Sequence, residues 1–363
     1  MPRHRYLLVG ALGTVVTLAA MCSTQGDGTP RPQESDAGAG SNSDARLDDS
    51  GARGDGSTDA QAECEQDLSV DAGCLRPPVV KNCRNGWCRI PKGCFVVGSP
   101  SCEPTRGKYD ETQFQVTLTH DFEMSDHETT QQEWTALGLL NPSGVVDGGA
   151  TQDCTEVDCP VGNVTIDEAM TFANKFSAVN GFPGCYTLGD CTGVLGRGLT
   201  CASVTSVAPS IYDCRGYRLP TEVEWEYAAR AGTKTAFYSG ELTSQEQCAE
   251  VANLERIAWY CHNSMARSHP IRQKEPNAWG LFDMSGNAGE WVTSKFAGAG
   301  YGGYDGGGPL VDPFSTLDFG DQGNVLRGGA VFGFLKNYRS ADRFTVGREL
   351  TAPTVGFRLV RSL

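Results

Sequence analysis

The chain has 363 residues, 39% of them hydrophobic, and a formal net charge of −14. This acidic balance argues against a nucleic-acid partner, because phosphate contacts need clustered Lys and Arg side chains. The hydrophobic residues are concentrated after residue 86, so we expect the folded core in that part of the chain.

The N-terminus has the pattern of a bacterial export signal. A basic start, residues 3–5, precedes an apolar run, residues 7–21, that ends at Cys22. The run is shorter than the ~20 residues of a transmembrane helix. We expect residues 1–22 to be a signal peptide whose Cys22 is lipidated, which makes the protein an exported, membrane-anchored lipoprotein, periplasmic or at the cell surface. The alternatives are plain secretion and an uncleaved anchor, because Met21 is larger than the residue usual before a lipidated cysteine.

Two further segments precede the expected domain. Residues 23–62 are rich in Gly, Ser, Asp and Ala, with Leu47 as their only larger aliphatic residue. Such a segment cannot bury enough apolar surface to offset its ordering entropy, so we expect a disordered tether. Residues 63–85 are cysteine-rich and lack apolar periodicity, and we expect an extension stapled to the domain at 86–363.

The cysteine count indicates disulfides. The chain has 15 cysteines, and setting Cys22 aside leaves 14 (15 − 1). An even number behind an export signal is typical of a disulfide framework. Zinc is the alternative, but the chain has no CxxC motif. One connectivity among many joins sequence neighbours, as Cys64–Cys74, Cys83–Cys88, Cys94–Cys102, Cys154–Cys159, Cys185–Cys191, Cys201–Cys214 and Cys248–Cys261.

Regular elements are expected to be few. Residues 89–98 and 112–124 have the composition and alternation of strands. Three Thr-x-x-Glu or Thr-x-x-Gln boxes predict helices starting at Thr129, Thr165 and Thr221.

Two long stretches, residues 184–214 and 294–324, have no clear periodicity, and we expect loops there. Together with the few helices and short strands, they indicate an irregular α+β domain stapled by disulfides.

An ordered set of motifs runs through the second half of the chain. They are GYRLPTE at 216–222, NAWGL at 277–281, DMSGNAGEW at 283–291, RGG at 327–329, RSADR at 339–343 and GFR at 356–358. In this order the motifs resemble the formylglycine-generating enzyme family, also called sulfatase-modifying factors, from about residue 86 to the end. The resemblance implies an irregular, loop-rich C-type-lectin-like fold.

The resemblance also implies a structural calcium site in the motif at 283–291. Its ligands would be the side chains of Asp283 and Glu290 and the carbonyls of Gly286 and Ala288. Calcium takes ~6–8 hard oxygen ligands, and two carboxylates that flank a glycine-containing turn can supply several. The alternative is a polar turn whose acids cap backbone amides.

The reactive site of the family has no counterpart. Its active enzymes bind copper through two cysteine thiolates placed between the RGG-like and RSADR-like motifs. This chain has no cysteine after Cys261, and Gly333 stands where the first would be. Because Cu(I) needs soft sulfur ligands, we expect no copper and no catalytic residue of that type.

Without that chemistry, we expect a binding or scaffold module for a protein, peptide or small-molecule ligand. The segment around 330–344 is apolar, which suits such a partner. Burial in the core is the alternative for its apolar residues. The expected ligand face comprises Val331, Phe332, Phe334, Leu335, Tyr338, Arg339 and Arg343.

Two open questions concern the charged and metal-binding residues. The arginines of the motifs could clamp an anionic ligand, but we favour pairing with nearby acids. The tryptophans Trp225, Trp279 and Trp291 are expected in the core.

The alternative function is an oxidoreductase, formylglycine-generating or non-haem-iron dependent, that modifies an exported protein or a small molecule. His262 and His269 are its candidate iron ligands.

Overall fold

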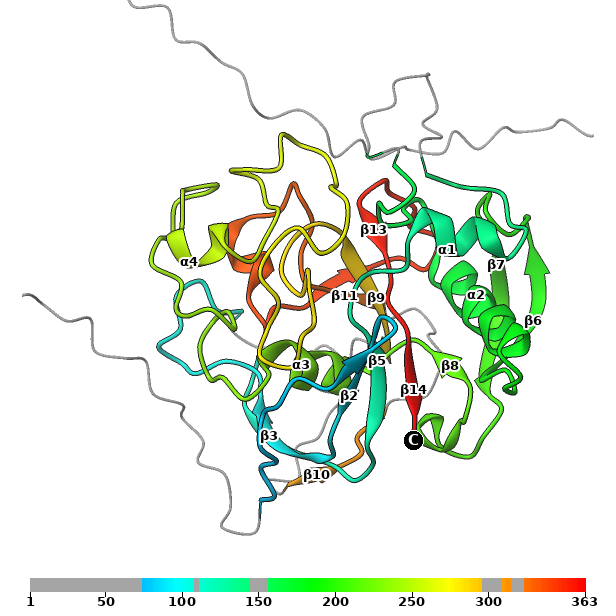
Figure 1. The fold of residues 1–363 in the computed structure, drawn as a ribbon, viewed down its shortest axis with the longest axis horizontal. Helices are drawn as coiled ribbons and strands as arrows, with labels where there is room; N and C mark the ends of the chain where they lie inside the picture. Colours follow the sequence, from blue (N-terminus) through cyan, green and yellow to red (C-terminus); the bar gives the residue numbers. More distant parts are fainter. Residues whose placement is uncertain (1–73, 108–110, 144–153, 155, 296–308, 315–322) are drawn as a thin grey trace, which may run out of the picture. The chain divides into compact units, whose positions relative to one another are not determined.

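The computed structural model describes residues 74–107, 111–143, 154, 156–295, 309–314 and 323–363 (Figure 1). The predicted signal peptide, the tether, Cys22 and Cys64 lie outside these residues. No helix among the residues described is long and apolar enough to cross a membrane.

A five-stranded sheet carries the two ends of the described domain. Its order is β1-β2-β5-β14-β8, and every neighbouring pair is antiparallel. The C-terminal strand β14 lies between β5 and β8 (Figure 1). Strand β1 belongs to the segment expected as an extension, so that segment enters the sheet. The bounds are β1 Cys83–Arg84, β2 Trp87–Ile90, β5 Phe122–Ser125, β8 Tyr217–Arg218 and β14 Val360–Ser362.

Three smaller sheets complete the strands described. They have the orders β10-β4-β3, β12-β11-β9-β13 and β6-β7. Their bounds are β3 Gly93–Val97, β4 Phe114–Leu118, β6 Tyr186–Thr192, β7 Thr200–Ser206, β9 Gly289–Lys295, β10 Leu310–Val311, β11 Asn324–Arg327, β12 Phe344–Val346 and β13 Val355–Gly356.

The helices are few and mostly short. They are α1 Gln131–Ala136, α2 Ile166–Val179, α3 Glu222–Arg230 and α4 Ala252–Glu255, with 3-10 turns η1 Ile211–Asp213 and η2 Leu335–Tyr338. Short strands, few helices and long connections confirm the irregular, loop-rich α+β class.

Each of the two segments predicted as one strand contains parts of two separate strands. The segment 89–98 divides into the end of β2 and β3 at Pro91, which has no N–H to donate to a ladder. The segment 112–124 divides into β4 and β5 near Asp121, whose carboxylate accepts a hydrogen bond from Lys92 N at 2.8 Å. The predicted alternation holds only in part in β4, where Val116 and Leu118 are buried but Gln115 is buried too.

The predicted capping boxes are confirmed at Thr165 and Thr221. Each Thr hydroxyl accepts from the backbone N–H of the Glu three residues on, whose carboxylate accepts from the Thr backbone N–H. The first box is one residue later than predicted, with Thr130 rather than Thr129 as N-cap. There Glu133 completes the box, and a carboxylate accepts hydrogen bonds more strongly than the Gln132 amide of the predicted register.

The prediction of a loop at 184–214 is wrong, because this segment contains a hairpin formed by β6 and β7. The disulfide Cys191–Cys201 joins two directly paired residues of its strands. Many residues of the two strands are exposed, so the strands lack the regular apolar positions by which a sequence predicts a strand.

Disulfides are confirmed, but only three of the seven predicted neighbour pairings form. Every cysteine that the structure describes is disulfide-bonded. Cys83–Cys88, Cys154–Cys159 and Cys248–Cys261 form as predicted. The other predicted pairings are wrong, because tertiary packing brings together cysteines from different segments. The observed bonds there are Cys74–Cys94, Cys185–Cys214 and Cys191–Cys201.

The core combines a large apolar cluster with buried charges. Trp225, Trp279 and Trp291 are at most 1% exposed, which confirms their predicted burial. In α2, Phe172 stacks on Trp134 of α1 at 5.2 Å and meets Phe357 edge-on at 5.3 Å. These contacts place α1 and α2 against the C-terminal segment.

Candidate functional site

The arginines of the motifs are structural. Arg218 donates to both oxygens of Glu224 at 2.7 and 2.8 Å, and neither side chain is exposed. Arg327 pairs with Glu226 at 2.5 Å, and Arg343 pairs with Glu222. The three glutamates lie on α3, so one helix anchors strand β8, the end of strand β11 and the residue before β12 through bidentate or short ion pairs. This confirms the expectation that these arginines pair with nearby acids.

Arg339 holds a separate segment. Its guanidinium contacts Glu103 and Glu111 at 2.6 Å and lies 3.6 Å from Asp342. Three carboxylates thus share one cation below the surface. Burial raises the pKa of Asp342 to about 6, although the charge of Arg339 lowers it.

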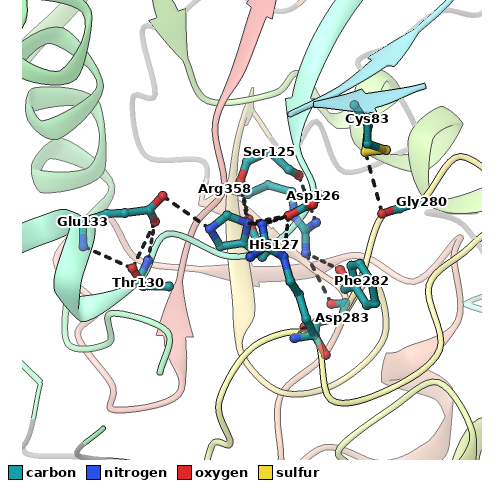
Figure 2. A network of polar contacts seen from close by, with 12 residues as sticks. Cys83, Ser125, Asp126, His127, Thr130, Glu133, Gly280, Phe282, Asp283 and Arg358 are labelled. Carbon is teal, nitrogen blue, oxygen red and sulfur yellow. Dashed lines mark hydrogen bonds and ion pairs between the residues drawn. A yellow bond between two sulfur atoms is a disulfide. The ribbon is translucent and has the colours of Figure 1, made fainter. Parts of the chain in front are cut away.

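The predicted calcium loop lies beside another buried pair. Arg358 donates to both oxygens of Glu290 at 2.5 and 2.7 Å, and Trp225 Nε1 donates to the same carboxylate at 2.7 Å. Arg358 Nη2 also donates to the carbonyl of Phe282 at 3.1 Å (Figure 2). Because Glu290 is engaged in this way, its carboxylate does not fit the role of a calcium ligand.

Asp283 does fit that role. Its Oδ2 accepts from Arg272 N at 2.8 Å, whereas its Oδ1 is buried with no hydrogen-bond partner among the residues described. The loop is tight at Gly286, where a Cβ would lie 2.2 Å from the carbonyl oxygen of Trp259. Among the described residues, no group of three or more His, Cys, Asp or Glu is placed to hold a metal ion. Calcium therefore stays a prediction of the resemblance.

Sequence reasoning missed Glu128 next to this loop. The side chain is fully buried, its Oε1 accepts a long hydrogen bond from Ala288 N at 3.4 Å, and its Oε2 has no partner among the described groups. Burial, with the nearby carboxylate of Asp283, raises its pKa well above the ordinary range. Burial likewise raises the pKa of Asp283. Glu128 and Asp283 thus place two protonatable carboxyls at this loop, and Glu128 lies two residues before the N-cap of α1.

A histidine network adjoins the same region. Figure 2 shows His127 between Asp126 and Glu133. Its Nδ1 lies 2.6 Å from Oδ1 of Asp126, and its Nε2 lies 3.3 Å from Oε1 of Glu133. Arg272 contacts Asp126 from the other side. Burial alone would lower the pKa of His127, but the two carboxylates raise it. The contact with Glu133 links the ring to the first turn of α1.

The candidate iron ligands are held by other groups. His262 Nδ1 lies 3.2 Å from the carbonyl oxygen of Cys248. His269 stacks on Trp259 at 3.8 Å, and its Nε2 lies 2.9 Å from the carbonyl oxygen of Ser264.

The expected ligand face divides into a buried and an exposed part. Phe332 and Phe334 are 56% and 52% exposed. Leu335 and Tyr338 pack in the apolar cluster that includes Leu254 of α4, whereas Arg339 and Arg343 are held in their ion pairs with glutamates. Five members of the face are therefore buried: Val331, Leu335, Tyr338, Arg339 and Arg343. For the apolar three, the core alternative is correct.

A third exposed phenylalanine was missed. Phe344 is 52% exposed and begins β12, directly after the RSADR motif. It lines a pocket of about 150 Å³ together with Phe334, Lys336, Asn337 and Thr105. The hydroxyl of Thr105 is buried there without a hydrogen-bond partner in the described part of the chain. We call Phe332, Phe334 and Phe344 the aromatic triplet.

The chain matches the family model of the sulfatase-modifying factor enzyme 1-like domain over residues 77–363. It therefore belongs to the formylglycine-generating enzyme, or sulfatase-modifying factor, family, with the loop-rich α+β fold of that family. The disulfides are typical of an oxidising, extracytoplasmic compartment.

Curated relatives are distant and only partly covered. The chain is 29% identical over 195 residues to the chaperone protein LppX of Paenibacillus barcinonensis, spanning 48% of this chain and 62% of that protein. It is 32% identical over 154 residues to the formylglycine-generating enzyme of Streptomyces coelicolor, spanning 39% and 46%. Less than two thirds of each relative is matched.

Solved structures show the same fold. Treponema denticola variable protein 1 aligns with a TM-score of 0.58 and 25% identity, covering 76% of this chain and 95% of that one. PvdO from Pseudomonas aeruginosa aligns with a TM-score of 0.54 and 22% identity, covering 76% and 94%.

Proposed function

We propose that this protein is an extracytoplasmic binding module built on the sulfatase-modifying factor fold, without the copper-dependent oxidase chemistry. The supporting observation is the aromatic triplet, which stands in and next to the segment where the active enzymes have their two cysteines. Phe334 and Phe344 line one pocket, Phe332 lies two residues before Phe334, and each of the three side chains is at least 52% exposed. A partner that covers these rings removes their apolar area from water.

The partner class is a protein or peptide with apolar side chains. Aromatic side chains bury much area for little loss of rotamer freedom, so they are common anchors of such interfaces. The pocket of about 150 Å³ between Phe334 and Phe344 has room for one side chain of the partner. That one relative is named a chaperone is in keeping with a protein partner.

The proposal includes a lipid anchor at Cys22 and a calcium ion at the loop 283–290. Lipidation at Cys22 would tether the domain to a membrane through residues 23–62, with no other membrane contact. Calcium at the loop 283–290 would be structural, with Asp283 as its side-chain ligand and the carbonyls of Gly286 and Ala288 beside it.

Selection from a random peptide display library tests the binding face. We expect enriched peptides that bind the wild-type domain and lose at least tenfold in affinity when Phe332, Phe334 and Phe344 are replaced by Ser. The matched control replaces three exposed apolar residues elsewhere, Val179, Val207 and Met265, and should leave the affinity within about twofold. Equal loss in the control variant, or no enriched peptide, would contradict the proposal.

A further inference from the structure

Three carboxylates and one guanidinium are buried at the loop 283–290. They belong to Glu128, Asp283, Glu290 and Arg358, and each of these residues is at most 1% exposed. Arg358 donates to both oxygens of Glu290, so its charge is already paired. The other two acids form no ion pair with a described Lys, Arg or His. Ionised, they leave two buried negative charges without a counterion.

The cations of the neighbouring cluster are paired with other acids. His127 lies between Asp126 and Glu133, and Arg272 also contacts Asp126. This cluster has two acids and, with the ring protonated, two cations. Its charges therefore balance within the cluster and do not neutralise the acids of the loop.

One oxygen of each unpaired acid has no donor. Oε2 of Glu128 and Oδ1 of Asp283 are buried without a hydrogen-bond partner among the residues described. The second oxygen of each carboxylate accepts from a backbone N–H, of Ala288 at 3.4 Å and of Arg272 at 2.8 Å respectively. Because Ala288 belongs to the loop, its contact places the Glu128 carboxylate at the loop. A buried charge is costly unless a counterion or a metal ion meets it.

The segment of Glu128 also lies against the start of the loop. Phe282 N donates to the carbonyl of Asp126 at 2.8 Å. Arg358 reaches the carbonyl oxygens of Phe282 at 3.1 Å and of Asp283 at 3.4 Å (Figure 2). The two unpaired acids are close enough that Asp283 is the strongest neighbouring charge acting on Glu128.

The loop adds backbone oxygens to these two carboxylates. Among the described groups, no donor hydrogen-bonds to the carbonyls of Gly286 and Ala288. Carboxylate and carbonyl oxygens are hard ligands, which suit calcium rather than copper. A divalent ion also carries the two positive charges that the buried acids lack.

We propose, on the basis of the calcium ion assigned above, that Glu128 is a ligand of this ion in the place that the family pattern gives to Glu290. Oε2 of Glu128 and Oδ1 of Asp283 bind the same ion, together with carbonyls of the loop. Glu290 stays paired with Arg358 beside the site. The second acidic ligand thus comes from the segment before α1 and not from the motif at 283–291.

The test compares the wild-type domain with Glu128→Gln, each in saturating CaCl₂ and in EGTA. With calcium, we expect the variant to melt several degrees lower, because a neutral amide is a weaker calcium ligand. Calorimetric titration with CaCl₂ should show an affinity at least about tenfold lower. In EGTA the variant should melt no lower than the wild type, since the amide removes one of the two unpaired buried charges. A side chain with only a packing role would lower the Tm equally under both conditions.

Glu123→Gln is the matched control. Glu123 lies on β5 and pairs with Arg361 at a part-exposed position, so its replacement should leave the calcium affinity within about twofold. Calcium binding by Glu128→Gln as tight as by the wild type, or an equal loss of Tm with calcium and with EGTA, would overturn the role of Glu128 and leave the ion in place. A wild-type domain that binds no calcium would overturn both the ion and this ligand.

Discussion

Arg358 donates two hydrogen bonds to Glu290 across 68 positions of sequence, and neither side chain is exposed to solvent. The pair ties the loop before β14 to strand β9, next to the indole of Trp225. Glu290, one of the two motif acids expected to bind calcium, is therefore the acid of a buried ion pair.

Breaking this pair should be costly. We expect Glu290→Gln to lower the free energy of unfolding by about 3–5 kcal/mol, because Arg358 would keep its buried charge without a counterion. The control is Glu123→Gln, which breaks the part-exposed pair with Arg361 and should cost about 1 kcal/mol or less. Urea denaturation of both variants measures the difference. An equal loss of unfolding free energy in the two variants would show that burial of the Arg358–Glu290 pair does not raise the cost of breaking it.

Calcium should stabilise the domain through Asp283. We expect chelation with EGTA to lower the Tm of the wild-type domain, because the ion binds the folded state. In Asp283→Asn this shift should be much smaller, since the amide is a neutral ligand. An unchanged wild-type Tm at saturating chelator would argue against the ion.

His120 should make stability fall at alkaline pH. Burial alone would lower its pKa, but hydrogen bonds with Asp312 and Glu224 raise it to about 9. Near pH 6 the ring is protonated in both states and its ion pairs contribute fully. Between about 6.5, the ordinary pKa, and 9 the unfolded chain loses its proton first, so this contribution disappears.

The expected loss is at most about 2 kcal/mol, since the ring is partly exposed. Urea denaturation between pH 6 and 9.5 measures it. The variant His120→Gln should remove this pH dependence, and an equally steep fall in the variant would assign the effect to another group.

The disulfide map can be checked by peptide mapping without reduction. We expect peptides joined by Cys185–Cys214 and Cys191–Cys201, and essentially no free thiol in the denatured, unreduced domain. Peptides joined by Cys185–Cys191 instead would contradict the structure.

The sequence predicts the class of fold because its motifs carry local signals. The capping boxes at Thr165 and Thr221 fix helix starts through contacts between residues three apart. The acids and arginines of the motifs indicate their own pairing. Apolar periodicity fails at the hairpin of β6 and β7, because its strands are half-exposed and its staple is a disulfide.

The candidate sites are less predictable because they depend on distant contacts. Cys185 pairs with Cys214 rather than with its near neighbour, and no spacing rule selects between them. Whether Phe334 is exposed and Leu335 buried depends on how η2 packs on another segment.

The central claim is that the scaffold persists without copper–thiolate oxidation. Its most direct test is incubation of the purified domain with Cu(I), oxygen and a cysteine-containing sulfatase peptide, followed by mass spectrometry for the aldehyde. We expect no formylglycine, because no cysteine follows Cys261 and every described cysteine is in a disulfide. Copper-dependent formation of the aldehyde would contradict the account.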